Sequence, residues 1–167
     1  GGPQFTHVAG WQAGIVIRQI VLGLPARAVA RAVPRVTYCE PELAQVGLTE
    51  AEAGELHGDR LSVLRAEFRH NDRAQAEARP EGLIKLLVVA GRPVGVGIVG
   101  PRAGELVGLW ALAIGARLKL SAVAGMIAPY PTFGEVSKRA AGAYFSPKLF
   151  GNPTLKRFVR LVQRWIP

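Results

Sequence analysis

Several residue types on which particular kinds of chemistry depend are scarce in this sequence. Its 167 residues contain one cysteine, Cys39, which excludes an intrachain disulfide and a multi-cysteine metal site. Cys39 is predicted to be a small, half-buried residue of a strand, and a chain without disulfides is typical of the cytoplasm. The three histidines are scattered, none of them in the spacing of a zinc site, and no serine stands in a nucleophile elbow. Independent metal or serine-hydrolase chemistry is therefore not expected.

Long apolar runs are also missing. No stretch reaches the roughly 20 consecutive apolar residues that a membrane-spanning helix needs. The most apolar segment, Gly82 to Gly100, includes Lys85, Arg92 and Pro93 and is typical of paired strands. The first residues carry no basic signal region and no initiator methionine, so we expect the chain to begin partway through a longer gene product. A membrane is not among the expected partners.

Acidic residues are few, since 12 Asp and Glu stand against 21 Lys and Arg, for a net charge of +9. A nucleic-acid-binding protein gathers its cations on one face. Here most of them are spread along the chain, and only the stretch from Lys148 to Arg164 concentrates them. A missing acidic partner domain would explain the imbalance equally well. We therefore expect no nucleic-acid partner.

Hydrophobic periodicity predicts mostly strands in the first two thirds of the chain and helices after them. Strands are expected over 35–40, 43–48, 61–69, 83–89 and 94–99, the last two forming a hairpin. Helices are expected over 7–22 with Thr6 as N-cap, after Thr49, and over 106–114, 122–127, 135–144 and 154–165. Residues 26–34 form a linker, and 71–79 a short helix or loop. This order predicts an α+β fold, in which an antiparallel sheet is layered with helices.

One glycine motif, Gly95-Val-Gly97-Ile-Val-Gly100, matches the dinucleotide-binding pattern G-x-G-x-x-G. That pattern binds pyrophosphate where a helix begins over its last glycine, so that free backbone N–H groups meet the phosphates. Here strand-forming residues fill the motif, Pro101 follows at once, and no acid stands about 20 residues further on. The glycines therefore favour close packing in the second arm of a hairpin.

The most unusual local sequence is Ala128-Pro-Tyr-Pro-Thr-Phe-Gly-Glu135. Two prolines restrict the backbone around Tyr130, and the Tyr130–Pro131 bond is a candidate for the cis form. Thr132 and Glu135 have the spacing of a capping box, which predicts the start of a helix. The structural interpretation is a rigid turn between two helices. The functional interpretation is that this turn presents the Tyr130 phenol and the Glu135 carboxylate to a site.

This segment resembles the C-terminal signature of the FAD-dependent pyridine nucleotide-disulfide oxidoreductases, which include lipoamide dehydrogenase, glutathione reductase and mercuric reductase. Three further segments are similar to parts of that family, in the same order and spacing. They are Phe5-Thr-His-Val-Ala9, Val36-Thr-Tyr-Cys-Glu-Pro-Glu-Leu-Ala-Gln-Val-Gly-Leu-Thr49 and Gly100-Pro-Arg-Ala-Gly-Glu105. The resemblance covers nearly the whole chain.

The resemblance implies a division of the chain. Residues 1–32 correspond to the tail of an FAD-binding domain and 33–147 to the interface or dimerisation domain. The helical pattern and the cations of the remaining residues, 148–167, predict a C-terminal basic helix. In the family, the helix that closes the FAD-binding domain points its N-terminus at the flavin pyrimidine edge. Thr6 and His7 would therefore contact FAD through their backbone amides.

The resemblance also implies a catalytic role for Tyr130 and Glu135 at the partner subunit's active site in a homodimer. Disulfide-reducing members have a His at the position of Tyr130, paired with a Glu at that of Glu135. A phenol with a pKa of about 10 is a poor general base at neutral pH. Tyr130 looks more like the mercuric-reductase-like branch, although the chain ends without the cysteine pair common there.

The redox cysteine pair and both nucleotide-binding domains of the family are absent from these 167 residues. The resemblance therefore implies a parent enzyme that uses FAD and NAD(P)H, with missing FAD and NAD domains, and a fragment that is inactive alone. The alternative, from a different class, is a non-catalytic dimerising module for protein interaction. Bound flavin in the full-length protein distinguishes the two.

Overall fold

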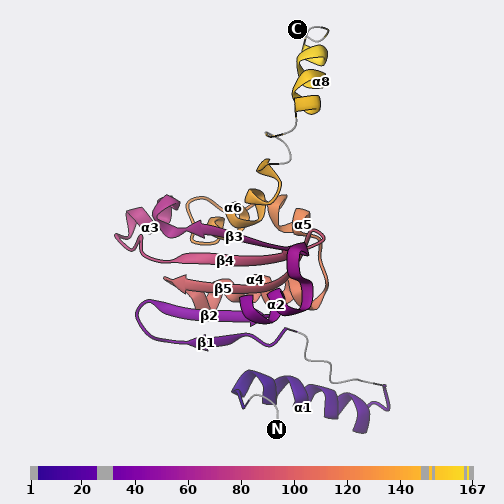
Figure 1. The fold of residues 1–167 in the computed structure, drawn as a ribbon. Helices are drawn as coiled ribbons and strands as arrows, with labels where there is room; N and C mark the ends of the chain where they lie inside the picture. The colour runs from indigo at the N-terminus through magenta and orange to yellow at the C-terminus, as the bar shows by residue number, and fades with distance from the viewer. Residues whose placement is uncertain (1–3, 26–31, 148–150, 152, 164, 166–167) are drawn as a thin grey trace.

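The structure of the chain is a computed structural model that describes residues 4–25, 32–147, 151, 153–163 and 165. Its centre is an antiparallel five-stranded sheet in the order β1-β2-β5-β4-β3 (Figure 1). The strands are β1 (Arg35–Thr37), β2 (Glu42–Gly47), β3 (Leu61–Glu67), β4 (Leu83–Val89) and β5 (Arg92–Gly100). The predicted α+β fold is therefore confirmed.

The helices precede the sheet, interrupt it and follow it. They are α1 (Thr6–Ile20), α2 (Glu50–His57), α3 (Asp72–Ala76), α4 (Ala103–Gly115), α5 (Leu120–Ala124), α6 (Glu135–Ala143) and α8 (Pro153–Gln163), with 3-10 turns η1 (Gly58–Arg60) and η2 (Phe68–His70). No helix within the described residues has the length and apolar character needed to cross a bilayer.

One face of the sheet forms the core, because alternate residues of adjacent strands point to the same side. The register places Ala44 opposite Ile98, and Ile98 opposite Ile84. These three side chains are fully buried, and α4 and α6 pack over the sheet. Trp110 on α4 is also fully buried, and its indole N–H donates to the Ser137 hydroxyl of α6 at 3.1 Å. This hydrogen bond joins the two helices that cover the core.

The opposite face of the sheet is only partly covered. Helix α2 contacts β3, β4 and β5, and Thr49 caps it in a complete capping box with Glu52. Beyond α2 the face carries a largely apolar hollow of about 490 Å³, whose lining includes Leu43, Leu83 and Val99. Leu43 is 45% exposed and Val99 38% exposed. The described residues thus leave a row of apolar side chains on this face in contact with solvent.

The glycines of the G-x-G-x-x-G motif lie inside β5, so the predicted hairpin arm is confirmed. A Cβ on Gly95 would stand 2.0 Å from the Leu48 carbonyl oxygen. One on Gly100, whose φ is +151°, would stand 2.4 Å from the Phe68 ring. A Cβ on Gly97 would meet no atom within 4 Å. Two of the three glycines are therefore required by close packing, and no helix begins over the last of them.

Three local predictions are wrong. Thr6 is the first helical residue of α1 and not its N-cap, because the Phe5 carbonyl accepts the first helical hydrogen bonds, from Val8 and Ala9. Strand β1 ends at Thr37, earlier than predicted. Cys39 lies beyond the strand and is exposed, and its thiol donates to the Pro41 carbonyl oxygen at 3.0 Å. Of the predicted linker and basic stretch, residues 26–31, Lys148 and Arg164 lie outside the described residues.

Substitutions in the glycine motif test whether packing alone explains it. We expect Gly100→Ala to lower the free energy of unfolding by about 2–4 kcal/mol, because an overpacked ring contact adds to an unfavourable φ. The matched variant Gly97→Ala is expected to change it by less than about 1 kcal/mol. Urea unfolding followed by tryptophan fluorescence measures both. Equal losses in the two variants would contradict the packing explanation.

Candidate functional site

The loop between α5 and α6 carries Tyr130 and is held in place by one buried side chain. Asn71, which is 3% exposed, donates from its amide nitrogen to the Thr132 carbonyl oxygen at 2.9 Å. Its amide oxygen accepts from the Ala74 N–H at 2.9 Å and so caps α3. Burial of such a group is tolerated because both ends of the amide are hydrogen-bonded. Asn71 therefore fixes the loop against the start of α3.

Tyr130 lies at the exposed tip of this arrangement, 71% exposed. Its peptide bond to Pro131 is cis, as predicted. The phenol donates a hydrogen bond to the Asp72 carboxylate at 2.8 Å. This bond, with the negative charges of Asp72 and Glu135, raises the pKa of the Tyr130 phenol. The phenol is thus neutral at ordinary pH, and its one O–H is engaged.

Glu135 has a different hydrogen-bond partner from the one that the family resemblance implies. Its carboxylate accepts from the Thr132 N–H at 3.2 Å, while the Thr132 hydroxyl donates to the Pro129 carbonyl oxygen at 2.7 Å. Only half of the predicted capping box forms, because the Glu135 N–H donates to the Thr132 carbonyl oxygen and not to its hydroxyl, and Gly134 is the N-cap of α6. Tyr130 lies in the loop and Glu135 is the first residue of α6, but the partner of the phenol is Asp72. Sequence reasoning missed Asp72, since the two residues lie 58 positions apart.

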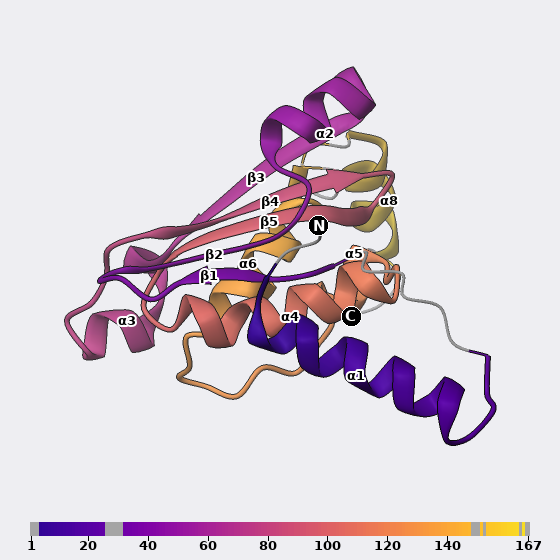
Figure 2. The same cartoon turned by 90° about the horizontal axis from the view of Figure 1, so that it is seen from below.

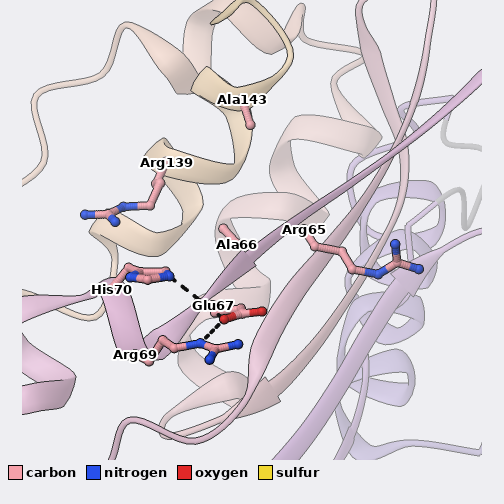
Figure 3. A pocket seen from close by; sticks show the side chains of 7 residues that line it. All are labelled: Arg65, Ala66, Glu67, Arg69, His70, Arg139 and Ala143. Atoms are coloured by element: carbon pink, nitrogen blue, oxygen red, sulfur yellow. Dashed lines mark hydrogen bonds and ion pairs between the residues drawn. The ribbon is translucent and has the colours of Figure 1, made fainter. Parts of the chain in front are cut away.

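A polar hollow of about 420 Å³ lies beside the same elements, between the end of β3, η2 and α6 (Figure 3). Its lining includes three arginines, one acid and one histidine, namely Arg65, Arg69, Arg139, Glu67 and His70. The single acid, Glu67, is hydrogen-bonded to Arg69, which lowers the pKa of its carboxyl, and lies 4.0 Å from the His70 ring nitrogen. In Figure 3 Arg65 points away from the other cations. Cations outnumber acids here, so the hollow favours an anionic group.

The described residues contain no group of three His, Cys, Asp or Glu side chains that could hold a metal ion. The chemistry available at the loop is that of a neutral phenol, two carboxylates and nearby arginines. Such groups position and polarise a bound molecule, but they include neither a thiol nor an imidazole base in contact with Tyr130.

Thr6 and His7 lie at the start of α1, in a second region. His7 contacts the Pro34 carbonyl oxygen through its ring nitrogen at 3.0 Å and stacks on Phe5 with 5.1 Å between ring centroids. Among the described residues, the backbone N–H groups of Thr6 and His7 have no acceptor. An adjacent cavity of about 470 Å³ is lined by Phe5, Thr6, His7, Pro34, Val36, Tyr38, Gly104, Val107 and Gly108. A cavity therefore lies beside a helix start whose first N–H groups lack an intrahelical acceptor.

The two candidate regions lie at opposite edges of the sheet. The start of helix α1 contacts the segment just before β1, at one edge of the sheet, through His7 and Pro34. It also lies beside α4 (Figures 1 and 2). Tyr130 bonds to α3, which follows β3 at the other edge. Four strand spacings separate the edge strands, a distance of about 19 Å. The structure places Tyr130 in the loop before α6 and Glu135 at the start of α6, and it keeps both away from Thr6 and His7.

Known proteins match this chain over most of its length. A dihydrolipoyl dehydrogenase of Chlorobaculum parvum is 33% identical over 89% of the chain and 32% of its own length. A mercuric reductase of Lysinibacillus sphaericus is 35% identical over 84% of the chain and 26% of its own length. The HOCl-induced flavoprotein disulfide reductase of Escherichia coli superposes with a TM-score of 0.78 at 25% identity, over 85% of this chain and 33% of that one.

The chain spans about a third or less of the length of these relatives. The sequence profile of the pyridine nucleotide-disulphide oxidoreductase dimerisation domain matches residues 33–141, which include the whole sheet, α4, α5, the Tyr130 loop and most of α6. The fold, the loop and this match agree, and the chain belongs to the family of pyridine nucleotide-disulphide oxidoreductase dimerisation domains.

Proposed function

We propose that this chain is the dimerisation part of an FAD- and NAD(P)H-dependent oxidoreductase of the mercuric-reductase-like branch. In a homodimer it would complete the active site of the partner subunit with Tyr130 and Glu135. Residues 1–32 would end the FAD-binding domain, 33–147 would form the interface domain and 148–167 a basic C-terminal helix. The observation that carries the proposal is the family match over residues 33–141 together with the exposed Tyr130 held on Asp72.

The separation of the two regions supports a site shared between subunits. The two sheet edges are about 19 Å apart, which is more than a single side chain spans. Tyr130 therefore cannot meet a group bound at Thr6 and His7 of its own chain. A second copy that presents its α1 edge to the Tyr130 edge removes this difficulty. The exposed apolar face at Leu43 and Val99 is a further surface that a partner would bury.

The residues at the start of α1 fit one edge of a flavin. Two N–H groups that have no acceptor among the described residues, at the positive end of a 15-residue helix, lie beside a cavity, and such an end stabilises negative charge. FAD, when bound, supplies the electron relay between NAD(P)H and the acceptor. Thr6 and His7 would hold the pyrimidine edge of that group through their amides. The rest of its binding site would come from the missing FAD and NAD domains.

Tyr130 would act as a neutral hydrogen-bonding group and not as a base. Its proton is donated to Asp72, so the phenol oxygen presents its lone pairs to a molecule in the site. Glu135 would stabilise the loop through the Thr132 N–H and add negative charge. Thiol chemistry that needs a His at position 130 is not what this arrangement favours. The fragment alone would be inactive, and the parent enzyme cytoplasmic.

Removing the phenol oxygen tests the role of Tyr130 in the full-length protein that contains this chain. We expect Tyr130→Phe to lower kcat by about tenfold or more, because a positioned polar contact to the reacting molecule is lost. Steady-state kinetics with disulfide, quinone and metal-ion acceptors measures it. A circular dichroism spectrum that matches the unmodified protein is the control for folding. Unaltered kinetics with every acceptor would rule out a catalytic role.

The Tyr130–Asp72 pair also has a pH signature in the isolated chain. The folded state favours the neutral phenol, so Tyr130 should lose its proton at a higher pH than an ordinary tyrosine. The pair's contribution to stability is present below pH about 10 and is lost as the pH rises through the folded pKa. Phenolate absorbance at 295 nm measures this titration. Asp72→Asn should lower the midpoint, and Tyr130→Phe should remove that component. An identical titration in Asp72→Asn and the unmodified chain would contradict the pairing.

Association and flavin binding test the domain assignment separately. We expect the isolated chain to sediment at twice its 17.8 kDa mass and to bind no flavin, because it holds only one edge of the site. The full-length protein should carry FAD, visible by its absorbance near 450 nm. A full-length protein purified without flavin, and not reconstituted by added FAD, would favour the non-catalytic interaction module.

A further inference from the structure

The C-terminal helix α8 (Pro153–Gln163) exposes apolar side chains that nothing in the described residues covers. Phe158 is 61% exposed, Leu161 55% and Trp165, just after the helix, 81%. The spacing of three residues places Phe158 and Leu161 on one side of α8, and Trp165 follows just after its end. Lys156, Arg157 and Arg160 project from the other side by the same spacing. Figure 1 shows α8 lying apart from the sheet and its covering helices.

The excess positive charge of the chain lies in its C-terminal part, from Lys138 and Arg139 on α6 to the end. Residues 1–135 contain 14 Lys and Arg and all 12 Asp and Glu, a net charge of +2. Residues 136–167 contain seven Lys and Arg and no acid, so they carry +7 of the total of +9. A missing acidic domain would not explain why the excess is confined to the last 32 residues. Helix α8 thus has one apolar face with aromatic residues and one cationic face. A partner that contacts both faces must combine an apolar surface with negative charge.

We propose that α8 binds the surface of an anionic lipid bilayer and lies parallel to it. Apolar side chains then enter the boundary of the acyl chains, while the cations stay at the level of the anionic headgroups. Eleven residues span about 16 Å, roughly half the apolar thickness of a bilayer, so the helix lies on the membrane and does not cross it. The expectation that a membrane is not a partner rested on the lack of a spanning run, which a surface helix does not need.

Other partners satisfy only one face of α8. A nucleic acid would pair with Lys156, Arg157 and Arg160 but leave Phe158 and Trp165 in water. An apolar groove on a protein would cover those rings without using the confined positive charge. Helix α1 gives an internal comparison, because Ile17 and Ile20 are 55% and 78% exposed there, beside the single cation Arg18. The proposal for α8 does not depend on the proposed enzymatic function.

Vesicle flotation of the full 167-residue chain tests the proposal. The probes are vesicles of phosphatidylcholine alone and of phosphatidylcholine with about 30% phosphatidylglycerol, at low and at high salt. We expect binding to the anionic vesicles only, weakened at high salt because exposed charges are screened. Replacing Lys156, Arg157 and Arg160 by Gln should weaken binding about fivefold per charge, or about 100-fold together. Phe158→Glu with Leu161→Glu should abolish it.

The matched control carries Ile17→Glu and Ile20→Glu on α1, and it should float as the unmodified chain does. In a Trp11→Phe background, the Trp165 emission should shift to shorter wavelength on anionic vesicles, since Trp110 is already buried. Three results would overturn the proposal. They are no flotation at low salt, equal flotation with neutral vesicles, or an equal loss of binding in the α1 control. Displacement by a single-stranded RNA of the chain bound to vesicles, with tighter binding to that RNA, would assign the basic face to nucleic acid instead.

Discussion

The position of the candidate site depends on the buried amide of Asn71. One side chain joins the first turn of α3 to the loop before α6, by a donor to Thr132 and an acceptor from Ala74. Removing either partner would leave a buried polar group unsatisfied, at a cost of about 1–3 kcal/mol. The same amide therefore holds two segments 61 residues apart in the sequence, and with them Asp72 and Tyr130. Phe133, buried against Phe68, anchors the loop from its other side.

The strand order of the antiparallel sheet places the two candidate regions at opposite edges. The helix start at Thr6 precedes edge strand β1, and the Tyr130 loop meets the helix that follows edge strand β3. Between them lie β2, β5 and β4, whose core face is fully used by α4 and α6. No small rearrangement of side chains can join the two regions within one chain. A domain of this kind is suited to contribute different groups to two different sites.

The central hairpin could be predicted from the sequence because β4 and β5 are short apolar runs joined by a turn sequence that contains Gly91 and Pro93. The cap of α2 was predictable because Thr49 and Glu52 are close in the sequence. The family resemblance found the Tyr130 loop but not its partner. In the sequence, Asp72 looks like an ordinary acidic residue in the first turn of a helix. Its contact with Tyr130 depends on how α3 and α6 pack. Thr6 and Thr132 were assigned as caps by residue type, whereas Phe5 and Gly134 occupy those positions.

The separation of α8 from the rest of the fold affects how that segment can change over generations. None of its described residues belongs to the hydrophobic core, so substitutions there cost little folding free energy. Selection for a stable fold therefore acts only weakly on the sequence of α8. A regular division into apolar and cationic sides would drift towards an ordinary polar tail unless contact with something outside the domain preserved it. The segment can acquire or lose such contact without any penalty to the domain that carries it.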